Sequence, residues 1–279
     1  MSTRPSPEPK GNTAKAAAKR LRPFGDYFVI AAVTLVLLAL WEAAVRFWEV
    51  PQFVLPPPTD VIRRLAADFT SGVLIGHFVT TLIEVVLGFA FAAIIGVGLG
   101  CAIGLVSMVE RIVYPYVLAL QTIPKVALAP LMIIWVGFGI QSKIVTAGLI
   151  AFFPILVNVV AGIKTVEPRR ILLMRALKAS PWQTFIKVRL PSMLPYLFAG
   201  FEVGIIFAVI GAIVGEFLGS SRGLGSLVIQ RQAAIDVAGV FSVLFYLSVM
   251  GIALNLILRS IARRYAFWSH RGDVGEHSA

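Results

Sequence analysis

The sequence predicts an all-α integral membrane protein with six transmembrane helices. Of its 279 residues, 58% are hydrophobic and only 14% are charged, whereas soluble domains are about 45–50% apolar and about 25% charged. Several apolar runs approach or exceed the ~20 residues that an α-helix needs to cross a hydrocarbon core about 30 Å thick. Lys and Arg residues are concentrated in alternate segments between these runs, as in multi-pass membrane proteins.

Six apolar runs account for the expected spans. They cover residues 27–45, 76–106, 109–138, 140–163, 194–218 and 240–258. The third run contains three prolines, which a membrane tolerates because neighbouring helices and waters satisfy the carbonyl groups that proline frees. The basic segment before the first run is also typical of a signal peptide. No small-x-small cleavage site follows it, so we expect an uncleaved first span.

The distribution of basic residues predicts the orientation. With the N-terminus inside, eighteen of the 25 Lys and Arg residues lie in cytoplasmic segments. The six assigned to outer segments are Arg46, Arg63, Arg64, Lys143, Arg222 and Arg231. This bias predicts that both termini are cytoplasmic. The formal charge of +11 then reflects topology, and we expect no nucleic-acid partner. The expected location is a bacterial inner membrane, with the spans in the lipid bilayer.

The chain is expected to comprise three parts. Residues 1–24 are polar and basic, cannot bury a core, and are interpreted as a disordered cytoplasmic tail. Residues 25–268 form the transmembrane domain, and residues 269–279 form a cytoplasmic C-terminal tail. Within the domain, the Leu-Pro-Pro-Pro-Thr-Asp run at residues 55–60 ends one segment and begins a short helix at the outer surface.

Several kinds of chemistry are disfavoured. Cys101 is the single cysteine and the three histidines have no ligand-like spacing, so we expect no metal site. The chain contains no Gly-x-x-x-x-Gly-Lys-Ser/Thr motif, so it is not expected to bind ATP itself. An intramembrane enzyme would need a Ser/His or paired-Asp constellation, and the spans contain none.

Small residues recur every fourth position in the second span. Gly88, Ala92, Gly96, Gly100 and Gly104 form one smooth ridge along a helix. Such a ridge lets a second helix approach closely, so we expect this span to pack tightly against a neighbour.

The largest polar stretch between spans is residues 164–191. Ser180 and Gln183 have the spacing of a capping box, with Pro181 at the first helical position. We therefore expect one helix to end near Ala179 and a second to run from Pro181 to residues 190–191, where Leu-Pro ends it. The second helix has an apolar face, which either docks into a groove of a soluble partner or lies on lipid. The sequence pattern alone does not decide between docking into a partner and lying on lipid.

This stretch resembles the EAA loop of ATP-binding cassette importer permeases. Lys-Ala-Ser at residues 178–180 stands where Gly-Ala-Ser is usual, and residues 188–191 fit the closing Ile-x-Leu-Pro. The Glu-Ala-Ala triplet is replaced by Leu-Leu-Met at residues 172–174, which is a departure from the family pattern. Over residues 25–268 the chain is similar to the branch that imports nitrate, sulfonates, taurine, thiamine-precursor pyrimidines and riboflavin. The matching segments are residues 55–58, 121–125, 129–131, 135–139, 152–154 with Asn158, 215–217 and 223–225.

The resemblance implies the type I ABC importer permease fold, with cytoplasmic coupling helices. It also implies a second copy of the chain in a homodimer, two cytoplasmic ATPase subunits that bind ATP and Mg, and an extracytoplasmic solute-binding protein. No cofactor is expected in this chain. The residues expected to couple to the ATPase are Arg175, Ala176, Lys178, Ala179, Ser180 and Gln183.

Polar residues at membrane depth are the candidates for the translocation pathway, because an uncompensated charge there costs several kcal/mol. Lys125 stands between two prolines, in a helix that we expect to be unwound. Mutual pairing, snorkelling and bonding to free carbonyl groups are alternative roles for such charges. The pathway candidates are Glu84, Lys125, Asn158, Glu202 and Glu216.

The residue type at position 84 is informative about the class of solute. Relatives that import anions tend to have a basic residue at this place, whereas relatives that import pyrimidines tend to have Glu. The resemblance therefore favours a heterocycle such as a thiamine-precursor pyrimidine or riboflavin over a sulfonate, taurine or nitrate. An ion-coupled carrier acting alone is a further alternative, but it would not explain a basic, capped loop of the EAA type.

Overall fold

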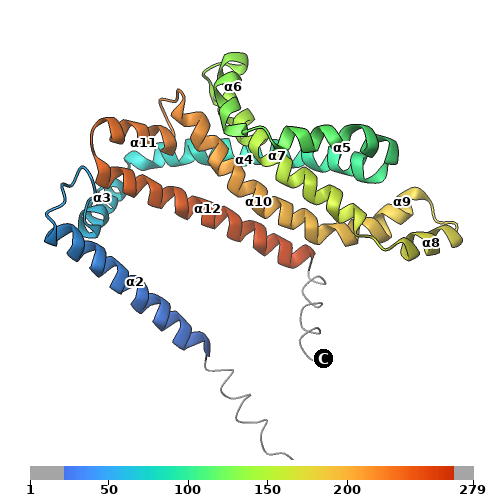
Figure 1. Cartoon of the computed structure of the whole chain (residues 1–279), viewed down its shortest axis with the longest axis horizontal. Helices are drawn as coiled ribbons and strands as arrows, with labels where there is room; N and C mark the ends of the chain where they lie inside the picture. Colours follow the sequence, from blue (N-terminus) through green and yellow to red (C-terminus); the bar gives the residue numbers. More distant parts are fainter. Residues whose placement is uncertain (1–21, 267–279) are drawn as a thin grey trace, which may run out of the picture. The chain divides into compact units, whose positions relative to one another are not determined.

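The computed structural model describes residues 22–266, and within that range it is helical, with no strand (Figure 1). The C-terminal tail and nearly all of the N-terminal tail expected from the sequence lie outside the described residues. The chain divides into two compact units, one up to Arg63 and one from Arg64 onward.

The first unit contains α2 (Arg22–Phe47) and the start of α3 (Pro58–Ser71). Glu42 on α2 accepts hydrogen bonds from the Thr59 amide at 3.1 Å and the Thr59 hydroxyl at 2.9 Å. Amides in the first turn of a helix have no partner within the helix, so Glu42 satisfies one of them. This contact supports the start of α3 at Pro58, the last residue of the proline run.

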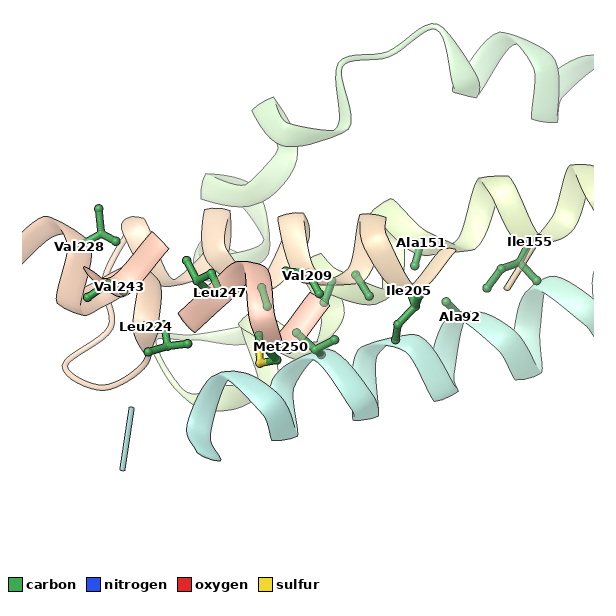
Figure 2. Close-up of a cluster of buried hydrophobic side chains, with 14 of the residues drawn as sticks. Ala92, Ala151, Ile155, Ile205, Val209, Leu224, Val228, Val243, Leu247 and Met250 are labelled. Atoms are coloured by element: carbon green, nitrogen blue, oxygen red, sulfur yellow. The ribbon is translucent and has the colours of Figure 1, made fainter. Parts of the chain in front are cut away.

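The second unit is built around three long helices that lie side by side: α4 (Val73–Leu105), α7 (Ile140–Lys164) and α10 (Leu190–Phe217) (Figure 1). Two further helices, α11 (Leu224–Ala233) and α12 (Val237–Tyr265), pack against α10. Figure 2 shows the apolar side chains that these helices bury together, including Ala92, Ile155, Ile205 and Leu247.

The glycine ridge of α4 faces α7, which confirms the close approach predicted from its spacing. A Cβ atom on Gly88 would lie 2.6 Å from the Ala147 Cβ and 2.9 Å from the Ile144 carbonyl oxygen. A Cβ atom on Gly100 would lie 2.7 Å from a Val159 methyl group. Real Cβ contacts are not this short, so only glycine permits this separation of the two helices.

Among residues 22–266, five helices are long and apolar enough to cross a membrane, and a bent pair makes a sixth candidate. The pair consists of α5 (Ser107–Gln121), followed by η1 (Lys125–Leu128) and α6 (Ala129–Val136), with an angle of 89° at the break. The break immediately precedes Lys125, where the sequence predicted unwinding. Proline disfavours the helical conformation of the residue before it and donates no hydrogen bond, so Pro124 accounts for the break.

A buried ion pair joins α3, α11 and α12. The two terminal nitrogens of Arg231 each lie 2.6 Å from an oxygen of Asp68, and the Ser242 hydroxyl donates to the same carboxylate at 2.6 Å. Burial acts to raise the pKa of Asp68, but hydrogen bonds from Arg231 and Ser242 together with the charge of Arg231 hold it below its usual value. Because the folded-state pKa is lowered, the pair stabilises the fold above the unfolded-state pKa of about 4 and loses this contribution as pH falls through the folded-state value.

Replacing Asp68 with Asn is expected to lower the free energy of unfolding by about 3 kcal/mol or more, because Arg231 would keep its buried charge without a counter-ion. Thermal unfolding of the detergent-solubilised protein measures this as a fall in Tm. The matched control is Asp60→Asn, because Asp60 pairs at 3.0 Å with Arg63, whose side chain is 80% exposed, and such pairs contribute little. Equal falls in Tm for the two variants would contradict this account.

Candidate functional site

The loop between α7 and α10 begins with α8 (Pro168–Ala176), which ends in a Schellman motif. The Lys178 amide donates to the Arg175 carbonyl at 2.9 Å, and the Ala179 amide donates to the Met174 carbonyl at 2.9 Å. Lys178 has φ 53°, the left-handed conformation that this motif requires. Glycine adopts it without strain, whereas a side chain costs roughly 1–2 kcal/mol, so Lys178 occupies a position that suits glycine.

A capping box follows immediately and confirms the sequence prediction. The Gln183 amide donates to the Ser180 hydroxyl at 3.2 Å, and the Ser180 amide donates to the Gln183 side chain at 2.8 Å. The C-terminal motif of α8 and the N-terminal box of α9 (Pro181–Thr184) leave only residues 177–180 between the two helices. The turn is therefore held by backbone and side-chain hydrogen bonds on both sides.

The expectation that Leu190 and Pro191 end the second helix is wrong. The helix continues from Pro181 to Phe217 through η2 (Phe185–Arg189), a wider π turn, and on into α10. Leu190 keeps helical angles, φ −58° and ψ −50°, and donates to the Phe185 carbonyl five residues back. This shift in hydrogen bonding accompanies the entry of Pro191 at the start of α10, where a proline lacking an N–H is tolerated.

The predicted apolar face of this helix is divided between two environments. Phe185 and Leu190 pack against the main core, whereas Trp182 and Ile186 remain 68% and 42% exposed. Of the predicted coupling residues, Arg175 and Ala179 line a pocket of about 300 Å³ that also contacts Arg189. The other predicted coupling residues, which lie along the exposed edge of the same loop, are Ala176, Lys178, Ser180 and Gln183.

A second polar site lies at the opposite end of α10, where α11 begins. Glu216 accepts hydrogen bonds from the Gly225 and Ser226 amides in the first turn of α11 and from the Thr81 hydroxyl at 2.6 Å. Free amides and the helix dipole favour a carboxylate at this place. Gly223 leaves no space for a Cβ beside the Glu216 carboxylate and has φ 122°, a conformation that favours glycine. Glu216 therefore holds the turn between α10 and α11.

Two further charged groups adjoin Glu216. The Glu84 carboxyl is 1% exposed and lies beside that of Glu216, and its Oε2 atom has no hydrogen-bond partner among the described residues. Lys143 is also 1% exposed and donates to the carbonyl oxygens of Phe138 at 2.7 Å, Gly139 at 3.2 Å and Gly219 at 3.2 Å. The ammonium thus links the turn before α7 to the turn after α10.

The sequence interpretation assigned Lys143 to an outer segment and did not single out Thr81. The available signal for Lys143 was its position three residues into the apolar run that begins at Ile140. Nothing in the sequence marked Thr81 as a functional residue, because the hydroxyl of a threonine within a membrane span usually donates to a backbone carbonyl of its own helix. Here it bonds the His77 carbonyl in that way, and it also reaches Glu216 and the Leu224 amide.

The remaining predicted pathway residues lie elsewhere. The Lys125 ammonium donates to the Gln121 carbonyl at 3.0 Å and lies 4.8 Å from the centre of the Phe153 ring. Asn158 donates to the Pro154 carbonyl at 2.8 Å, and it lies about four helical turns along α7 from Lys143. Glu202 pairs with Arg259 at 3.0 Å. The fold therefore brings together Glu84 and Glu216, whereas Lys125, Asn158 and Glu202 have other partners.

The helices of membrane-spanning length, the tightly capped loop and the buried charges define a polytopic membrane protein. The family model of binding-protein-dependent transport system inner membrane components matches residues 93–267, which is more than half of the chain. The chain belongs to this family and is the permease subunit of an ATP-binding cassette importer.

Curated relatives agree with this assignment. A formylaminopyrimidine transport permease of Halalkalibacterium halodurans is 36% identical over 78% of this chain and 86% of its own length. A riboflavin transport permease of Chloroflexus aurantiacus is 36% identical over 84% of this chain and 87% of its own. A taurine transport permease of Escherichia coli is 29% identical over 93% and 97%. These proteins belong to the branch expected from the sequence motifs.

The fold is that of a solved importer. A chain of the MetNI methionine ABC transporter, in an inward-facing conformation, superposes with a TM-score of 0.63 at 23% identity. The match covers 70% of this chain and 97% of that chain. It confirms the expected type I permease fold.

Proposed function

We propose that this permease imports a small nitrogen heterocycle, such as a thiamine-precursor pyrimidine or a flavin. The observation that carries the proposal is the hydrogen bonding of the buried charged side chains near α11. Lys143 directs all three N–H bonds at carbonyl oxygens, so it has no donor left for an anion, whereas Glu84 presents a carboxyl group. The names of the two 36% identical relatives support the same class of solute.

A small anion is the second candidate. An aliphatic sulfonate permease of Bacillus subtilis, described as putative, is 30% identical over 84% of this chain, and the taurine permease is 29% identical. Arg222, in the turn after α10, is exposed and offers a positive charge to a negative group. The buried side chains do not extend this attraction inward, because the three donors of Lys143 are engaged and Glu84 and Glu216 are carboxyl groups.

We also propose that the chain works as a homodimer with two ATPase subunits, which hydrolyse ATP, and receives its solute from an extracytoplasmic binding protein. Both termini and the loop between α7 and α10 then lie in the cytoplasm. Closure of the ATPase pair would push the two copies of α8 and α9 together and move the spans between inward-open and outward-open states. The pocket beside Arg175 and Ala179 offers a concave surface for an ATPase side chain.

Uptake of labelled solutes tests the solute class. Cells that express the permease with its partner subunits are expected to accumulate labelled formylaminopyrimidine or riboflavin, and cells without the permease are the control. Accumulation of labelled taurine or an alkyl sulfonate alone would overturn the heterocycle proposal and favour the anion.

A further inference from the structure

An open pocket of about 540 Å³ lies at the α11 end of the bundle. It is formed by Thr80 and Glu84 of α4, by Phe138 and Lys143 at the start of α7, and by Gly219 and Arg222 after α10. These segments are far apart in sequence and meet at the Lys143 ammonium, which bonds the turns on both sides of the pocket.

The polar side chains on the inner wall of this pocket offer acceptors. The Lys143 ammonium has its three donors engaged, and the Thr80 hydroxyl donates to the Gly76 carbonyl at 2.9 Å, which leaves its lone pairs free. Ser221 and Arg222 supply donors at the exposed rim, where water screens the charge of Arg222. A ligand that bonds the inner wall must therefore bring its own N–H or O–H groups.

Glu84 is the group on the inner wall that can still accept a hydrogen bond. Its Oε2 atom is buried and receives no hydrogen bond from any amide, hydroxyl or ammonium among the described residues. Glu216, in contrast, receives bonds from Thr81 and from two α11 amides. A buried polar atom without a donor costs free energy, and a ligand that supplies the donor recovers it.

We propose that this pocket is a solute-binding site in which Glu84 accepts a hydrogen bond from an amino or ammonium group of the solute. The inference rests on the proposed function of the chain as a solute importer, and it names the chemical group of the solute that the permease recognises. Glu84 lines the pocket but is almost fully buried, so the solute reaches it after neighbouring side chains of the pocket wall rotate away, with the three Lys143 bonds intact.

Direct binding to the complete transporter in lipid nanodiscs, without the solute-binding protein, tests the site. The probes are 4-amino-2-methylpyrimidine with its amine-free partner 2-methylpyrimidine, and taurine with its amine-free partner ethanesulfonate. At least one amine-bearing probe is expected to bind about tenfold more tightly than its partner, the effect of one hydrogen bond to a buried carboxyl group. Equal affinities within both pairs, or no binding of either amine, would overturn the proposal.

Two variants assign the effect to Glu84. Glu84→Met removes the acceptor and is expected to abolish the difference within each pair. Glu84→Gln keeps an oxygen acceptor without the charge, so it should preserve a preference for the neutral aminopyrimidine and remove one for the ammonium of taurine. The control is Glu110→Gln, which changes a carboxylate paired with Lys164 outside the pocket and should alter no affinity.

The outcomes separate this inference from the proposed function. Uptake of a labelled heterocycle that is unaffected by Glu84→Met, in a transporter that binds no amine probe, would overturn the site and leave the heterocycle proposal standing. Selective binding of taurine over ethanesulfonate, lost in Glu84→Gln, would support the site while contradicting the heterocycle.

Discussion

Replacing Ala179 with Glu is expected to abolish transport while the chain still folds and inserts. Ala179 lines the pocket between α8 and α9, and Arg175 and Arg189 line the same pocket. A glutamate there would fill the space and form an ion pair within the loop, so an ATPase side chain could no longer enter. Losing about 2 kcal/mol of docking free energy corresponds to a roughly 30-fold fall in solute uptake.

Solute-stimulated ATPase activity of the reconstituted transporter measures the coupling, and the amount of permease in the membrane reports insertion. The backbone bond from the Ala179 amide to the Met174 carbonyl does not involve the side chain, so the turn should survive. Lys187→Glu is the matched control, because Lys187 is exposed on the same segment and does not line the pocket. Equal activity of the two variants would contradict docking and favour a loop that lies on lipid.

Replacing Gly88 with Val is expected to disrupt the packing of α4 on α7. The new side chain would meet the Ala147 Cβ and the Ile144 carbonyl oxygen, and the second contact is backbone that cannot rotate away. Overpacking of a rigid contact commonly costs 1–3 kcal/mol, and we expect about 3 kcal/mol or more here. The result would be a marked fall in Tm and in the yield of folded protein.

Gly98→Val provides the control on the same helix. A Cβ on Gly98 has no neighbour within 4 Å, so valine fits there without a clash. Because valine has a slightly higher helix propensity than glycine, this variant should be neutral or slightly stabilising. Similar losses of stability at both positions would mean that the close approach to α7 does not explain the need for glycine at Gly88.

The features that depend on local sequence were predictable. The apolar runs gave the positions of the spans, because the length of an apolar helix must match the membrane. The period of four in α4 predicted a close contact with a neighbouring helix, which the structure shows to be α7. The capping box at Ser180 predicted the start of α9. Pro124 marked the break before Lys125. Each of these depends on residues within one or two helical turns of each other.

The remaining features were decided by tertiary packing. Thr81 and Glu216 are 135 residues apart, and Asp68 and Arg231 are 163 apart, so no local pattern reports that they meet. The sequence placed Lys143 in an outer segment, but its ammonium is buried because the turns before α7 and after α10 supply three carbonyl oxygens. Pro191 does not end its helix, because the preceding π turn rearranges the hydrogen bonds and Leu190 packs against the core. The sequence by itself determined which segments are helices in a membrane; only the packing of those helices determined which charges meet, because burial makes partners of groups that are distant in the chain.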